Sequence, residues 1–82
     1  MGTLYIVGTP IGNLQDLTER SRVVLGAVSL VAAEDTRVTR KLLNHIQLRT
    51  PLISYHAHNW QARIPSLLET LNSGDVALVS DA

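Results

Sequence analysis

Four short apolar runs alternate with segments of helical character along this chain. The first run, residues 4–7, is unbroken, which is typical of a strand buried on both faces of a parallel sheet. Runs of the same kind predict further strands over residues 29–33, 51–55 and 75–79. Pro51 opens the third of these strands, a place where proline is tolerated because no ladder hydrogen bond is lost.

The first two segments between these runs carry helix signals. Thr18 is a suitable N-cap for a helix over residues 18–25, and Gly26 is expected to stop it. A second helix is predicted over residues 36–45, where apolar residues recur at every fourth position. The inward-facing residues expected in these two helices are Val24, Leu25, Val28, Val38, Leu42, Leu43 and Ile46.

The third segment shows the clearest helical periodicity in the chain. Its apolar positions are Trp60, Ile64, Leu67, Leu68 and Leu71. Pro65 interrupts this pattern because it removes one intrahelical donor, so the helix either begins near Ile64 or kinks there. Gly74 is expected to end it in the C′ position, and Trp60 is expected to pack in the core or as a staple.

This order of strands and helices with short connections predicts an α/β fold. We expect a mainly parallel sheet of about four strands with flanking helices and right-handed crossovers. The 82 residues suffice for one domain. The last strand would end at the sheet edge with no helix after it, so residues 1–82 are expected to be the N-terminal part of a longer protein.

Composition narrows the functional classes. The absence of cysteine excludes disulfides, thiolate metal sites and cysteine nucleophiles. Seven basic and seven acidic side chains give no net charge, so any nucleic-acid binding must come from a local patch. No apolar run approaches the roughly 18 residues of a membrane span, and no secretory signal opens the chain, so we expect a cytoplasmic protein without a membrane partner.

Polar or turn residues follow each predicted strand. Ligands in open α/β sheets bind beyond the carboxyl ends of the strands, so these residues form the expected site. Gly8 and Gly12 flank the first turn and would allow a positive φ or a close approach of the backbone. The other strand ends carry Glu34 to Arg37, His56 to Asn59, and Ser80 with Asp81.

The residues after the second strand allow two interpretations. Asp35 is either a helix N-cap or, with Glu34, an acid–base group. Arg37 opposes the helix dipole, so it should be held by a carboxylate or reserved for an anionic ligand. The cationic stripe of this helix is either a solvated face or an RNA phosphate contact. It consists of Arg37, Arg40, Lys41 and His45.

Other familiar sites are not supported. His56 and His58 stand two residues apart, but no third ligand is evident beside them, so no metal site is predicted. The chain has neither the P-loop motif nor G-x-G-x-x-G. Glu34 stands where a Rossmann acid would meet a ribose, but the glycines that accompany it are missing.

The segments LYIVGTPIGN, LVAAEDTRVTRKLL, YHAHN and VALVSDA resemble, in this order, the N-terminal part of a known family. These are the bacterial 16S rRNA ribose 2′-O-methyltransferases of the tetrapyrrole methylase superfamily, and the resemblance covers nearly the whole chain. It implies a two-domain enzyme that binds S-adenosylmethionine (SAM) between its domains. It further implies a cytidine of small-subunit 16S rRNA as substrate, and usually a homodimer.

The resemblance also implies roles for individual residues. The cofactor-binding residues would be Thr9, Pro10, Gly12, Ser80 and Asp81. The substrate-facing residues would be Arg37, Arg40, Lys41, His56, His58 and Asn59. Asp35 is the expected proton acceptor, with Glu34 beside it. The family continues past the last motif with a Gly-Thr-Pro loop and a second domain, so we expect this chain to be inactive alone.

Two alternatives remain open. A small-molecule methylase of the same superfamily would act on a tetrapyrrole, although GTPIGN and EDTR are typical of the RNA-modifying branch. A non-catalytic nucleotide- or RNA-binding module of this length would need no second domain.

Overall fold

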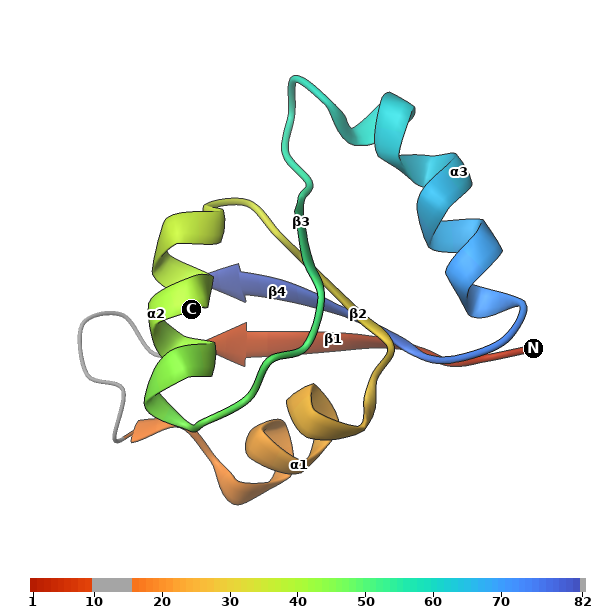
Figure 1. The fold of residues 1–82 in the computed structure, drawn as a ribbon. Coiled ribbons are helices and arrows are strands. Elements are labelled where there is room, and N and C mark those ends of the chain that lie inside the picture. Colours follow the sequence, from red (N-terminus) through yellow and green to blue (C-terminus); the bar gives the residue numbers. More distant parts are fainter. Residues whose placement is uncertain (10–15, 82) are drawn as a thin grey trace.

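The computed structural model describes residues 1–9 and 16–81. Strands and helices alternate in the predicted order, and the α/β prediction is confirmed (Figure 1). The strands are β1 (Leu4–Thr9), β2 (Leu30–Ala33), β3 (Leu52–Ser54) and β4 (Val76–Asp81). The helices are α1 (Glu19–Ala27), α2 (Thr36–His45) and α3 (Trp60–Leu71).

The four strands form one parallel sheet in the order β1-β4-β2-β3. The last strand in sequence therefore lies in the middle, where β4 pairs with β1 from Leu4↔Val76 to Thr9↔Asp81 and with β2 on its other side. Because all pairs are parallel, the carboxyl ends of the strands point toward the same edge of the sheet.

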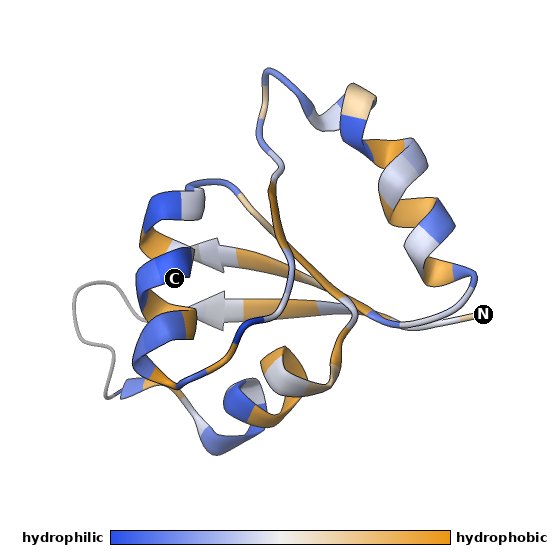
Figure 2. Cartoon of the chain, viewed as in Figure 1, coloured by the Kyte–Doolittle hydropathy of each residue, from blue (hydrophilic) through white to orange (hydrophobic). Residues whose placement is uncertain are grey.

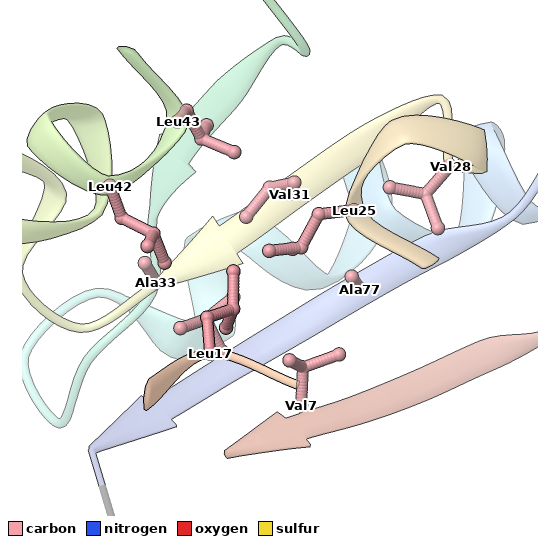
Figure 3. Packing of buried hydrophobic residues seen from close by; sticks show 10 residues of the cluster. Val7, Leu17, Leu25, Val28, Val31, Ala33, Leu42, Leu43 and Ala77 are labelled. Carbon is pink, nitrogen blue, oxygen red and sulfur yellow. The ribbon is translucent and has the colours of Figure 1, made fainter. Parts of the chain in front are cut away.

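Helices cover the two faces of the sheet unequally. Helices α1 and α2 lie on one face and α3 on the other (Figure 1). The main core lies under α1 and α2, and Figure 3 shows its side chains pointing toward one another. It consists of Val7, Leu17, Leu25, Val28, Val31, Ala33, Leu42, Leu43, Ala77 and Val79.

Helix α2 has the predicted bounds. Its polar and apolar residues separate into two faces, visible as blue and orange along the helix in Figure 2. One predicted inward residue is wrong, since Val38 is 49% exposed. Thr39 is buried instead, beside Leu42 and Leu43, because the buried face is rotated away from Val38 by part of a turn.

Neither Gly26 nor Gly74 ends its helix by adopting a left-handed conformation, so both predicted glycine stops are wrong. Gly26 lies inside α1, which runs on to Ala27. Gly74 does not adopt a positive φ; a Cβ there would lie 2.2 Å from the Ser29 Oγ, so the position requires close packing. Helix α2 does end with a left-handed residue, but that residue is not a glycine. Gln47 has φ 61°, and the Leu48 N–H donates to the Leu43 carbonyl at 2.8 Å in a Schellman motif.

Helix α3 begins at Trp60 and includes Pro65, so the later start near Ile64 is wrong. Pro65 is exposed, so water can reach the carbonyl that its missing N–H would otherwise bond. The predicted core role of Trp60 is also wrong, because 42% of its surface remains exposed. None of the residues of α3 is fully buried, and this helix only partly covers its face of the sheet.

The uncovered part of that face belongs to the edge strand β1. Leu4 and Ile6 are 48% and 66% exposed, whereas Ala32 and Val76 of the central strands are buried. Gly8 lies within β1 without a positive φ, so that part of the expectation for it is wrong, and Gly12 lies outside the described residues. No helix in the described part of the chain has the length and apolar character needed to cross a bilayer.

Candidate functional site

A hollow of about 280 Å³ opens where the carboxyl ends of β2, β3 and β4 meet the start of α3. We call it the strand-end hollow. Its lining residues are Glu34, Tyr55, His56, Ala57, Trp60, Leu78, Val79 and Ser80. The parallel sheet produces this convergence, because Glu34 and His56 follow the ends of β2 and β3, and Ser80 is the residue before the last of β4.

The turn after β3 holds the two histidines close together. The His56 backbone N–H donates to the Asn59 Oδ1 at 2.8 Å, and the His58 N–H donates to the His56 Nδ1 at 3.1 Å. Their ring centroids lie 5.9 Å apart. Both histidines belong to this turn and not to a strand, because β3 ends at Ser54.

The His58 contact determines which nitrogen of His56 carries the proton. Because Nδ1 accepts a hydrogen bond, the neutral ring carries its proton on Nε2. His56 therefore presents a donor nitrogen, and Glu34 is the carboxylate that lines the same hollow.

The Asn59 side chain forms its hydrogen bonds within its own turn and to the end of β3. Besides accepting from His56, its Nδ2 donates to the Ser54 Oγ at 2.9 Å. Its side chain makes no capping bond to α3, although it stands at the N-cap position. Asn59 thereby ties the turn to the end of β3 and sets the position of His56.

Asp35 is the N-cap of α2, as one of the two sequence-based interpretations expected. Its Oδ1 accepts from the Arg37 N–H at 3.0 Å and lies 3.3 Å from the Arg37 Nε. Hydrogen bonding to the Arg37 guanidinium, followed by the bond to its backbone N–H, lowers the pKa of Asp35. The carboxylate is thus engaged with α2, and Asp35 is not among the residues that line the strand-end hollow.

A second hollow, of about 490 Å³, runs beside the edge strand β3. We call it the β3-edge groove. Its lining residues are Thr36, Arg37, Arg40, Leu52, Ile53, Ser54 and Arg63. Arg37 and Arg40 of the cationic stripe line it, whereas Lys41 and His45 are exposed elsewhere on α2.

The expected cofactor residues lie around the ends of β1 and β4. Ser80 lines the strand-end hollow. Thr9 is buried and its Oγ1 donates to the Ser80 carbonyl at 3.3 Å, so this hydroxyl joins the two strand ends. Asp81 is paired with Thr9 in the sheet, while Pro10 and Gly12 lie outside the described residues.

No group of three His, Asp or Glu side chains within residues 1–9 and 16–81 is placed to hold a metal ion.

Comparison with known proteins shows to which family this chain belongs. The model of the tetrapyrrole (corrin/porphyrin) methylases matches residues 3–81, which is nearly the whole chain. The chain belongs to the tetrapyrrole methylase family. The resemblance noted in the sequence motifs is therefore confirmed at the level of the family.

Within the tetrapyrrole methylases, the chain is similar to several curated proteins called ribosomal RNA small subunit methyltransferase I. It is 58% identical to the one from Synechocystis sp., with 100% of this chain and 30% of that protein covered. Identity is 51% to the Mycoplasmopsis pulmonis protein and 52% to the Bacillus subtilis protein, again over 100% of this chain. The chain spans 37% and 28% of their lengths, respectively.

Sequence reasoning missed two residues that this member of the tetrapyrrole methylase family brings to the hollows. Trp60, for which the sequence predicts a place in the core or a staple, lines the strand-end hollow, and Arg63 lines the β3-edge groove. A signal for Arg63 was present, because it is the only basic residue of α3. Its meeting with the arginines of α2 depends on how the two helices are placed around β3.

Proposed function

We propose that this chain is the N-terminal domain of a two-domain, SAM-dependent methyltransferase that modifies the ribose 2′-hydroxyl of a cytidine in 16S rRNA. The observation that carries the proposal is identity above 50%, over the whole chain, to proteins named ribosomal RNA small subunit methyltransferase I. The strand-end hollow supports it, since it gathers polar groups where α/β sheets bind ligands.

The residues at the ends of β1 and β4 fit a bound SAM. No described atom beyond its chain neighbours lies within 4 Å of the position that a Cβ of Gly8 would take, so a ligand can approach this backbone closely. Gly8 is the partner of Ser80, which lines the hollow. Thr9 and Asp81 belong to the same strand ends, and Pro10 and Gly12 complete the proposed set. When bound, SAM supplies a methyl group carried on a sulfonium sulfur.

The other side of the hollow fits a nucleotide. Trp60 is partly exposed there and can stack on a base, a contact that proteins use with unpaired RNA. The His56 Nε2 can donate to a ribose or base oxygen. Asn59 positions His56 through the turn, and His58 sets its tautomer.

Methyl transfer to a hydroxyl requires alignment of the oxygen with the methyl carbon and an acceptor for the hydroxyl proton. Both Glu34 and Asp35 are candidates for this acceptor. Glu34 is favoured by its place in the hollow, since Asp35 caps α2 and its lowered pKa makes it a weaker base. Asp35 then acts by holding the start of α2 and Arg37.

The proposed partner is the small ribosomal subunit, bound through Arg37, Arg40 and Lys41. A cytoplasmic location follows from this substrate, because ribosomal subunits are cytoplasmic in bacteria. A homodimer of the whole protein is part of the same proposal, as the resemblance implies.

The test uses the full-length protein, methyl-labelled SAM and small ribosomal subunits that lack the modification. We expect label on a ribose 2′-oxygen of 16S rRNA. Binding of SAM without transfer to rRNA, but with transfer to a tetrapyrrole, would replace the proposed substrate. Binding of RNA with neither SAM binding nor transfer would instead indicate a non-catalytic module.

The Glu34→Gln variant tests the proton acceptor. Turnover should fall by about 10²-fold or more, the usual contribution of a general base, while SAM affinity changes little. The matched variant is Asp35→Asn, which keeps a good N-cap residue. If Glu34→Gln retains full turnover and Asp35→Asn loses it, the assignment passes to Asp35.

A further inference from the structure

The arginines of the β3-edge groove come from two helices that are separate in the sequence. Arg37 and Arg40 lie on α2, and Arg63 lies on α3. The seven residues that line the groove include these three arginines and no carboxylate. In a chain whose formal charges cancel, this is a local concentration of positive charge.

Arg63 is held in a fixed position in this groove. Its Nε donates to the Ser54 carbonyl at 3.1 Å, and its Nη2 donates to the Ser54 Oγ at 3.1 Å. A guanidinium has five N–H donors, so these two bonds leave three for a ligand. The bonds reduce the rotamer entropy that a bound anion would otherwise have to remove.

The two arginines of α2 differ in whether they pair with a carboxylate. Arg37 is paired with Asp35, so part of its charge is neutralised. Arg40 is exposed and has no hydrogen-bond partner among the described residues. The Asp35 carboxylate also caps the start of α2, so the attraction for an anion rests on Arg40 and Arg63 more than on the helix dipole.

The groove and the strand-end hollow are lined by consecutive residues of the chain. Ser54 lines the groove, and the next two residues, Tyr55 and His56, line the hollow. A chain of phosphates lying along β3 would therefore place a neighbouring nucleotide near Glu34 and Trp60. The groove volume of about 490 Å³ falls within the roughly 300–1,000 Å³ typical of ligand sites.

We propose that the β3-edge groove binds the phosphodiester backbone of an RNA strand through Arg63, Arg40 and Arg37, with Arg63 the residue contributed by α3. This inference rests on the proposed function, for which it names the surface that holds the substrate backbone. A purely structural role for Arg63 is the competing explanation, because charged side chains commonly cover exposed edge strands such as β3.

The experiment measures binding of the full-length protein to an unmodified 16S rRNA transcript over a series of KCl concentrations. Each phosphate contact contributes about one unit to the slope of log K against log salt, so Arg40→Gln/Arg63→Gln should reduce the slope by about two units. The matched control is Arg20→Gln/Arg22→Gln, which removes the same charge from exposed positions of α1 and should keep the wild-type slope.

Two further measurements distinguish failure of the groove proposal from failure of the methyltransferase proposal. Arg40→Gln alone should reduce the slope by about one unit, and it can be tested even if loss of Arg63 prevents folding. Equal slopes for wild type, the groove pair and the α1 pair would overturn the groove proposal. If wild type still methylates 16S rRNA in that case, the proposed function stands. If wild type methylates nothing but the groove pair alone loses slope, the groove stands and the methyltransferase proposal fails.

Discussion

Asp35 caps helix α2 and pairs with Arg37 through the same carboxylate. Both contacts favour the ionised form, so its pKa in the folded protein lies below its ordinary value of 3.8. Because the folded pKa is the lower one, the stabilisation is present above pH 3.8 and is lost as the pH falls through the folded pKa.

The Asp35→Asn variant tests this pH dependence. Asparagine also caps helices well but has no charge to titrate, so the variant should be less stable than wild type at neutral pH. The difference between the two urea midpoints should shrink as the pH falls below about 4 and vanish once Asp35 is protonated. A difference that stays constant down to about pH 2 would contradict the ion pair.

Sequence reasoning could identify Glu34 and Asp35 as candidates but could not separate them. Adjacent carboxylates look equivalent in the chain, whereas the folded protein directs one to the strand-end hollow and one to the α2 cap. The arrangement of His56 and His58 could not be predicted from the sequence either. Their arrangement depends on β3 ending at Ser54, and strand ends are poorly defined by local pattern.

At the scale of elements, the helices and strands follow from local signals. The bounds of α2 were predicted to the residue, and Thr18 caps α1 by accepting from the Ser21 N–H at 3.1 Å. The errors concern proline and glycine: Pro65 does not delay the start of α3, and two glycines do not end helices. A glycine signals a possible helix end, but Gly26 and Gly74 have other surroundings, which only the packing of distant segments reveals.

The Gly26→Ala variant should stabilise the protein by about 0.5–1 kcal/mol. Alanine is the better helix residue, and its Cβ would lie 3.5 Å from the Leu48 Cδ2, an ordinary contact. Urea unfolding of the two proteins measures the change. Gly74→Ala is the matched control and should destabilise, because its Cβ would lie 3.1 Å from the Ser29 Cβ. An equal stabilisation by Gly74→Ala, at a position beyond the end of α3, would contradict the predicted clash with Ser29.

At the scale of the whole molecule, the two faces of the sheet contribute differently to stability. The face under α1 and α2 contains the fully buried Leu25 and Leu43, while α3 leaves Leu68 59% exposed. Unfolding should therefore respond to substitutions in α2 far more than to those in α3.

Leu43→Ala should reduce the free energy of unfolding by about 2–5 kcal/mol, because it leaves a cavity in the core beside Val31. Leu68→Ala removes the same atoms from an exposed position and should change it by about 0.5 kcal/mol or less. Both are measured by denaturant unfolding of the same protein preparation. A large loss for Leu68→Ala would show that α3 packs against more than the described surface.

Local patterns along the chain predict the kind and order of the elements, the parallel sheet, and the edge at which polar residues gather. These follow from periodicity, caps and short connections, which act between near neighbours in the chain. The folded protein alone shows that β4 lies between β1 and β2, that α3 leaves Trp60 exposed, and that Arg63 meets the arginines of α2. Such features depend on how distant segments pack, because hydrophobic periodicity shows which face of an element is buried but not which other element covers it.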